Sequence, residues 1–129
     1  MKCSLIISNY NWPRALDLCL LSVSKQKVPP DEIIIADDGS DRATLQLIED
    51  YTKIFTVPLK HVWHEDLGFR KTLILNKAVK EASYEYIIQI DVDVILNPFF
   101  IKDHLASAEP NAVIRGTRAV LTAEKTADV

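Results

Sequence analysis

Glycine, cysteine and long apolar segments are all scarce in this chain of 129 residues, and each shortage excludes a class of protein. Three glycines, none near the end of the first apolar run, provide no glycine-rich loop for phosphate. No apolar stretch approaches the length of a membrane-spanning helix. The 15 basic residues are scattered, which argues against a nucleic-acid partner. We therefore expect no membrane span and no nucleic-acid partner, and a cytoplasmic location, with the inner face of the membrane left open.

The two cysteines, Cys3 and Cys19, are too far apart in the sequence to form a CxxC motif. The pattern around them predicts that Cys3 lies in a strand and Cys19 in a helix. Both would then be small core residues of a protein from a reducing compartment. A disulfide between them stays open at this point.

What the chain does have is a regular alternation of short apolar runs and helical patterns. Hydrophobic residues make up 48% of the sequence, enough for the core of one domain, and the formal net charge is −3. The alternation predicts an α/β fold, with a mostly parallel sheet and flanking helices. We expect strands at 5–7, 32–36, 59–63, 86–90 and 112–115. We expect helices at 13–25 with Asn11 as its cap, at 41–52 with Ser40 or Asp41 as its cap, at 70–82 and at 98–105, and a polar, frayed tail from about 122.

Two carboxylates one residue apart, Asp91 and Asp93, follow directly after the apolar run at 86–90. A short apolar run of this kind predicts a strand of a parallel sheet that is covered on both faces. Ligands bind just beyond the carboxyl ends of such strands. Two acids there favour a hard divalent cation, because Mg²⁺ binds through one or two carboxylates and substrate phosphates. A solvated acidic turn is the alternative for an isolated pair.

Polar side chains follow two other predicted strands at the same point, Ser8 to Tyr10 after the first and Asp37 with Asp38 after the second. Because the carboxyl ends of parallel strands share one edge, we expect the three clusters to form one binding site. Tyr10 offers a ring to stack on a base, or else packs under its loop. Asp38 offers an acceptor for an imide N–H. Asp37 is either a ligand contact or a buttress of the Asp-Gly turn.

Arg70 is expected at the start of a helix, where backbone N–H groups already favour anions. It can therefore contribute to binding a nucleoside diphosphate. Its alternative is an ion pair with Glu65 or Asp66 in the preceding loop. Asp91 and Asp93 would offer ribose and metal contacts to the same ligand.

Four motifs along the chain resemble those of family 2 glycosyltransferases with the GT-A fold. They are Ser8-Asn9-Tyr10-Asn11, Ala36-Asp37-Asp38-Gly39-Ser40, Asp66-Leu67-Gly68-Phe69-Arg70 with Asn76 downstream, and Asp91-Val92-Asp93. The third motif is similar to that of bacterial enzymes that build polysaccharides. The match runs from about residue 4 to about residue 115 in the family's order and spacing. Each motif alone is weak evidence, whereas four in order are strong.

The resemblance implies transfer of a sugar from a nucleotide-diphosphate donor, commonly a UDP-sugar, to a saccharide or lipid-linked acceptor, with Mn²⁺ or Mg²⁺ on the diphosphate. Ser8, Tyr10 and Asp38 would hold the base, Asp91 would lie near the ribose or the metal, and Asp93 on the metal. The residues that would bind the nucleotide-sugar are Ser8, Tyr10, Asp37, Asp38, Arg70 and Asp91.

The family's catalytic domain continues well beyond its D-x-D into a half that binds the acceptor and holds the general base. No acid after Asp93 matches that base motif, so the catalytic residue is unknown. We expect residues 1–129 to be the nucleotide-sugar-binding portion of a truncated transferase domain, with an unpaired strand edge around 112–121 through which the chain self-associates. One alternative is a nucleotide-sugar-binding module without catalysis. Another is a haloacid-dehalogenase-type phosphatase, with Asp91 as nucleophile and Asp93 as acid/base.

Overall fold

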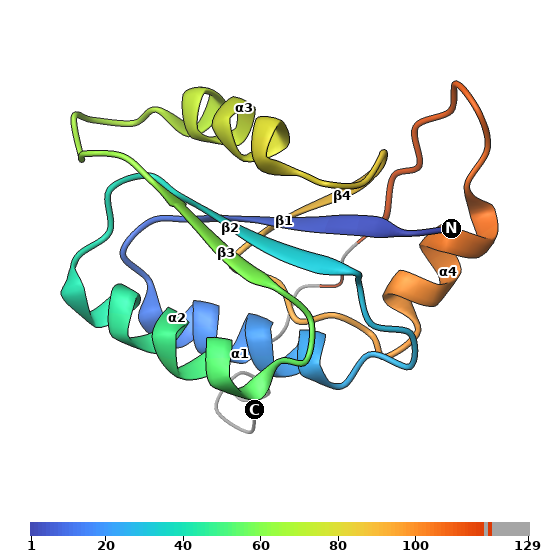
Figure 1. The fold of residues 1–129 in the computed structure, drawn as a ribbon, viewed down its shortest axis with the longest axis horizontal. Coiled ribbons are helices and arrows are strands. Elements are labelled where there is room, and N and C mark those ends of the chain that lie inside the picture. Colours follow the sequence, from blue (N-terminus) through green and yellow to red (C-terminus); the bar gives the residue numbers. More distant parts are fainter. Residues whose placement is uncertain (118, 120–129) are drawn as a thin grey trace.

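Four strands of the chain form one parallel sheet, and helices cover it on both faces (Figure 1). The computed structural model describes residues 1–117 and 119. The strands lie in the order β3-β2-β1-β4, and each neighbouring pair is parallel, which confirms the predicted α/β class. In chain order the elements are β1 (Cys3–Asn9), α1 (Pro13–Ser24), β2 (Glu32–Asp37), α2 (Arg42–Ile54), β3 (Leu59–Trp63), α3 (Lys71–Glu81), β4 (Tyr86–Asp91) and α4 (Phe100–Ser107).

The two central strands are buried along their whole length, because their apolar runs face helices on both sides. Leu5 and Ile7 of β1 belong to the core cluster that contains residues of α1 and α2. Ile6, which points to the opposite face, packs in a smaller cluster with Ile34 of β2 and Ile74 of α3. Figure 1 shows the same division, with α3 on one side of the sheet and α1 and α2 on the other. The two runs are thus apolar throughout because both faces of each strand are covered by helices.

The order of the strands creates a switch point between β1 and β4. The chain moves from β1 through α1 to β2, and through α2 to β3, always in the same direction across the sheet. It then returns through α3 to β4 on the far side of β1, so the helices before and after this reversal lie on opposite faces. A crevice forms at the carboxyl ends of the strands where such a reversal occurs, and ligands bind there in open α/β sheets.

The strand β4 is more exposed than its apolar sequence predicts. Ile88 and Ile90 are buried, but Ile87 is 37% exposed and Gln89 is exposed as well. By register Ile87 and Gln89 share the face of Ser4 and Ile6, on which α3 packs over β1, β2 and β3. The expectation that the run at 86–90 is covered on both faces is therefore wrong. Within the described residues β4 pairs with β1 alone, and its other edge is unpaired.

The predicted fifth strand at 112–115 is absent, since all four residues are irregular. Val113 is 95% exposed, so the segment buries too little apolar surface to offset the cost of ordering a strand. The unpaired edge expected around 112–121 is therefore not a strand at 112–117, and its residues 118, 120 and 121 lie outside the described residues, as does the tail expected from 122. The last helix begins at Phe100 rather than at 98.

The predicted cap of the first helix is also wrong. Trp12 is the N-cap residue of α1, and its side chain makes no capping hydrogen bond. The Asn11 side chain is used elsewhere, because its Oδ1 accepts a hydrogen bond from the backbone N–H of Asp41 at 2.8 Å. Asp41 is the N-cap of α2, as one of the two predicted alternatives, and accepts from the N–H of Ala43. Asn11 thereby ties the start of α1 to the start of α2.

A buried carboxylate holds the opposite end of the sheet together. Glu32 is 2% exposed, and its Oε1 accepts hydrogen bonds from the Ser4 hydroxyl at 2.6 Å and from the Ser83 backbone N–H. Its Oε2 lies 2.9 Å from Nζ of Lys60. Burial alone would raise the pKa of Glu32, but these partners outweigh it and hold the pKa below its ordinary value. Glu32 is thus a structural group, far from the switch point.

Cys3 and Cys19 are both free and fully buried, as core residues. Burial raises the pKa of the Cys19 thiol to about 12, so that it stays protonated and unreactive at neutral pH. Among the described residues, no helix combines the length and the apolar character that crossing a bilayer requires.

Candidate functional site

The switch point brings Ser8 at the end of β1 beside Asp91 at the end of β4. The two residues are register partners, and the Ser8 hydroxyl donates to Oδ1 of Asp91 at 2.7 Å. The backbone continues the pairing, since the N–H of Val92 donates to the carbonyl oxygen of Ser8 at 3.0 Å. These hydrogen bonds hold together two residues that are 83 positions apart, and they fix the position of Asp91, the first residue of the D-x-D segment.

A pocket of about 410 Å³ opens above this pair, and five of the predicted site residues line it: Ser8, Tyr10, Asp38, Asp91 and Asp93. Asp38 follows β2, and the D-x-D begins at the last residue of β4, so the two lie on the two sides of β1. The strands β2 and β4 are two strand spacings apart, about 10 Å, a separation that a nucleoside can span. The predicted convergence of three polar clusters at one rim is therefore found in the structure.

Asp91 is paired with a lysine that sequence reasoning missed. Nζ of Lys71 lies 2.7 Å from Oδ1 of Asp91, the same oxygen that accepts from Ser8. Lys71 is the first residue of α3, lines the pocket and is about one third exposed. The sequence offered one indication of this role, because Lys71 directly follows Arg70 at the start of a predicted helix. The pocket thus has a positive charge beside its acids.

The two acids of the D-x-D suit a hard cation that binds together with a ligand. Asp93 is exposed in the turn after β4, and Asp91 is half-buried. In the described part of the chain, no group of three or more His, Cys, Asp or Glu side chains could hold a metal. The residues that the structure describes therefore offer a metal the two carboxylates of Asp91 and Asp93 at this place. This donor set fits Mg²⁺ or Mn²⁺ that takes its other ligands from phosphate and water, and it does not fit a closed zinc site.

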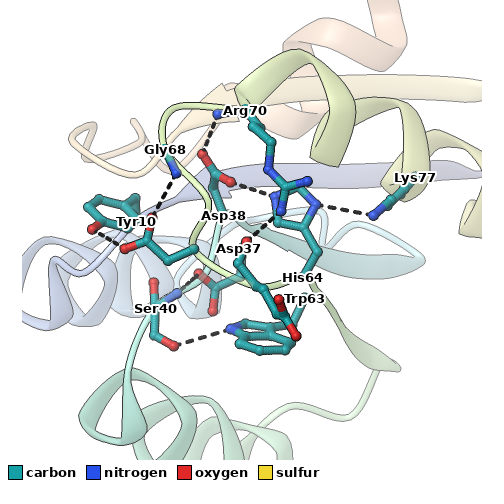
Figure 2. A network of polar contacts seen from close by, with 11 residues as sticks. Tyr10, Asp37, Asp38, Ser40, Trp63, His64, Gly68, Arg70 and Lys77 are labelled. Atoms are coloured by element: carbon teal, nitrogen blue, oxygen red, sulfur yellow. Dashed lines mark hydrogen bonds and ion pairs between the residues drawn. The ribbon is translucent and has the colours of Figure 1, made fainter.

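Asp38 is buried at the other side of the pocket, and both of its oxygens accept hydrogen bonds (Figure 2). The backbone N–H of Arg70 donates to Oδ2 at 2.8 Å, and Nε2 of His64 lies 2.5 Å from Oδ1. Burial alone would raise the pKa of Asp38, but the hydrogen bonds from Arg70 and His64 outweigh it, so the pKa lies below its ordinary value. Asp38 is therefore an ionised group that only accepts hydrogen bonds at neutral pH.

The Asp37–Ser40 turn is shaped by a close approach to the loop after β3. Gly39 has φ of +88°, and a Cβ there would lie 2.5 Å from the backbone N and Cα of Asp66. Asp66 in turn accepts a hydrogen bond from the Tyr10 hydroxyl at 2.6 Å, which raises the pKa of Tyr10. The Tyr10 ring is half exposed beside the pocket. Three loops thus support one another around the mouth of the site.

Asp37 and Arg70 do not line this pocket, although the sequence predicted both as ligand contacts. Asp37 is 1% exposed and supports the turn, since its Oδ1 accepts from the Ser40 N–H at 3.1 Å and its Oδ2 lies 2.7 Å from Nε2 of His61. The Arg70 guanidinium donates to the carbonyl oxygen of Glu65. In the structure Asp37 thus buttresses the Asp-Gly turn. Arg70 contacts the preceding loop through the backbone of Glu65 rather than through an ion pair with its side chain.

Three more residues at the site were missed from the sequence. Trp12 and Phe69 line the pocket with exposed rings, Phe69 with 88% of its surface exposed. His64 precedes the predicted motif by only two residues and was assigned no role, yet it contacts Asp38 directly. A histidine next to an acidic loop gives no sign of its partner when that partner is 26 residues away.

Comparison with known proteins identifies the family of this chain. Residues 4–125 match the family described as glycosyl transferase family 2. The chain is 26% identical over 125 residues to a chondroitin synthase of Escherichia coli, an alignment that covers 95% of this chain and 18% of the synthase. The chain therefore spans less than one fifth of the length of that relative.

Two solved structures share the fold. Residues 1–349 of S. aureus TarS, in complex with UDP-GlcNAc, align with a TM-score of 0.66 and 30% identity over 82% of this chain and 30% of that one. The mannosyltransferase PcManGT of Pyrobaculum calidifontis, in complex with GDP-Man and Mn²⁺, aligns with a TM-score of 0.75 over 84% of this chain and 33% of that one. Its 21% identity supports the fold alone.

Proposed function

Because this chain belongs to glycosyl transferase family 2, we propose that its pocket binds a nucleoside-diphosphate sugar, with UDP as the preferred nucleotide, together with Mn²⁺ or Mg²⁺. Residues 1–129 would be the donor-binding portion of an enzyme that transfers the sugar to a saccharide or lipid-linked acceptor. One observation carries the proposal: Asp38 and the D-x-D lie on the two sides of β1 and line the same pocket. The cytoplasm or the inner face of the membrane stays the predicted location.

The base would bind at Asp38 and Tyr10. Asp38 is ionised and only accepts hydrogen bonds, so it matches the ring N–H of uracil. The exposed Tyr10 ring offers a surface on which any base can stack. A uridine nucleotide seated in this way would direct its ribose toward Ser8 and Asp91, across the end of β1.

The diphosphate would lie near Asp93, Asp91 and Lys71. Asp93 and Asp91 would hold the divalent cation, which when bound neutralises the diphosphate and so stabilises the departing nucleotide. Lys71 adds positive charge at the same place, because its ammonium group lies 2.7 Å from Asp91. Since the described residues supply only two carboxylates, we expect the cation to bind tightly only when the donor adds its phosphate oxygens.

The chain alone is proposed to bind donor without transferring the sugar, which is the binding-module alternative. The acids that follow Asp93 within the described residues, Asp103 and Glu109, do not line the pocket and so offer no general base there. We also propose self-association, now through the unpaired edge of β4 rather than through residues 112–121, because exposed edges pair with other chains.

Calorimetric titration of this chain with UDP, with Mn²⁺ present and with EDTA, tests the proposal. We expect binding that depends on Mn²⁺ and that loses this dependence in Asp93→Ala, whose fold should be intact because the side chain is exposed. Asp103→Ala removes the same charge from an exposed position of α4 and should bind like the wild type. Equal UDP binding in EDTA and in Mn²⁺ would refute the metal role, and no UDP binding under either condition would refute the site.

A further inference from the structure

Asp38 is the last member of a chain of three side chains, and the proposed function leaves the other two, His64 and Lys77, without a role. Nζ of Lys77 lies 3.2 Å from Nδ1 of His64, and Nε2 of His64 lies 2.5 Å from Oδ1 of Asp38 (Figure 2). His64 is 7% exposed and Asp38 is 6% exposed, so water can hardly reach either side chain to replace a lost hydrogen-bond partner. The three come from the second half of α3, the loop after β3 and the turn after β2.

The lysine decides which nitrogen of the ring carries the proton. An ammonium group donates hydrogen bonds and cannot accept them, so Nδ1 of His64 must be the acceptor toward Lys77. The proton of the neutral ring therefore sits on Nε2, which donates to Asp38. Lys77, His64 and Asp38 thus form a directed chain of hydrogen bonds that ends on the carboxylate.

This chain fixes the orientation of the acid. The Arg70 N–H holds Oδ2 and the His64 ring holds Oδ1, so the carboxylate plane is set from two directions. A carboxylate so held presents only lone pairs to the pocket. It can accept from a base whose ring nitrogen carries a hydrogen, as in uracil, and it repels a base whose ring nitrogen is itself an acceptor, as in cytosine.

We propose that His64 and Lys77 are positioning residues which, through Asp38, set the preference of the pocket for uracil over cytosine nucleotides. The inference rests on the proposed function, because it names what selects the base at that same site. Neither residue lines the pocket, so both act through Asp38 rather than on the ligand.

The first test is the ratio of UDP to CDP affinity, measured by calorimetry with Mn²⁺. In His64→Leu the donor to Asp38 is lost, and we expect the ratio to fall about tenfold, the equivalent of one hydrogen bond to a charged group. His64→Gln keeps a side-chain donor and should restore most of the ratio. Lys77→Met should lower it roughly threefold, whereas Lys80→Met, a change on the same helix at an exposed position, should leave it unchanged.

The double variant His64→Leu/Lys77→Met separates positioning from general stability. If Lys77 acts through His64, the ratio in the double variant equals that of His64→Leu, because the path is already broken. A merely structural role would lower the stability of each variant and leave the ratio of the two nucleotides unchanged. Unchanged ratios in folded His64→Leu and Lys77→Met would overturn the inference while leaving the proposed function in place.

A second measurement does not depend on any nucleotide. ¹⁵N NMR of the wild-type imidazole should show a protonated Nε2 and an unprotonated Nδ1 for His64. A protonated Nδ1 would overturn the inference directly, even if every variant failed to fold. Absence of UDP binding by the wild type would instead refute the proposed function, and the base preference with it, while the NMR result would still report on the hydrogen-bond chain.

Discussion

Replacing Asp38 by Asn changes one atom at the centre of the proposed base site, and the structure predicts two separate losses. The amide keeps the size of the carboxylate but has one oxygen and one NH₂ group. In the wild type both oxygens accept, from the Arg70 N–H at 2.8 Å and from Nε2 of His64 at 2.5 Å. Whichever way the amide is turned, its NH₂ group therefore faces another donor.

The size of the effect follows from that mismatch. One buried donor is left without an acceptor, which costs about 1–3 kcal/mol of folding free energy. The base then meets a side chain that no longer offers only lone pairs. A loss of about 1–3 kcal/mol in binding corresponds to UDP affinity that is about fivefold to about 150-fold lower. The affinity for CDP should change less, because its ring nitrogen was repelled by the carboxylate.

Urea denaturation and calorimetric titration measure the two losses on the same samples. Asp41→Asn is the matched control, since it makes the same substitution at an exposed N-cap, where Asn and Asp are equally good caps. It should be about as stable as the wild type and bind UDP normally. If Asp38→Asn matches Asp41→Asn in both measurements, Asp38 neither needs its two donors nor reads the base, and the reasoning is refuted.

Gly39→Ala should destabilise the fold clearly more than Gly68→Ala. Both glycines have φ of +88°, so both substitutions share a conformational cost of about 1–2 kcal/mol. Only at Gly39 would the new Cβ also clash with a backbone, that of Asp66 at 2.5 Å. Equal urea midpoints for the two variants would contradict this contact. Tyr10→Ala should weaken binding of all nucleotides alike through lost stacking, and a loss confined to UDP in a nucleotide series would argue against stacking. Glu32 has a lowered pKa in the fold, so its stabilising contribution is fully present above its unfolded pKa of about 4.3 and is lost as the pH falls through the folded pKa. Acid unfolding of Glu32→Gln should accordingly show a shallower pH dependence than that of the wild type. Light scattering over a dilution series should show self-association through β4, and a strict monomer at all concentrations would exclude it.

Much of the fold could be predicted because each central element carries its own signal. The runs around Ile6 and Ile34 are apolar on both faces, and the structure buries both strands completely. The same signal failed for Ile87, which belongs to an equally apolar run but is 37% exposed, because an apolar run does not state how many neighbours a strand has. The strand predicted around Val113 is absent because β-branched residues favour a strand only where there is a surface to pack against.

The site was predictable to the extent that its residues follow directly after strands. Ser8, Asp38 and Asp91 all lie at or just beyond the carboxyl ends of three parallel strands, and the rule that carboxyl ends share one edge is enough to bring them together. Asp37 comes one residue before Asp38. Because successive side chains of a strand point to opposite faces, Asp37 points away from the pocket and contacts His61. Side-chain direction within a turn is decided by the contacts of that turn.

The sequence by itself determined the class of fold, the rim at which the polar residues gather and the family to which the chain belongs, because these depend on local periodicity and on the order of motifs. Only the tertiary structure decided the partners of the charged groups. Lys71 reaches Asp91 and Lys77 reaches Asp38 through His64 because α3 crosses the sheet and packs beside β1 and β2. The sequence alone does not distinguish a helical lysine that faces solvent from one that contacts a buried acid. The difference arises only when the return crossover from β3 to β4 brings α3 over the ends of other strands.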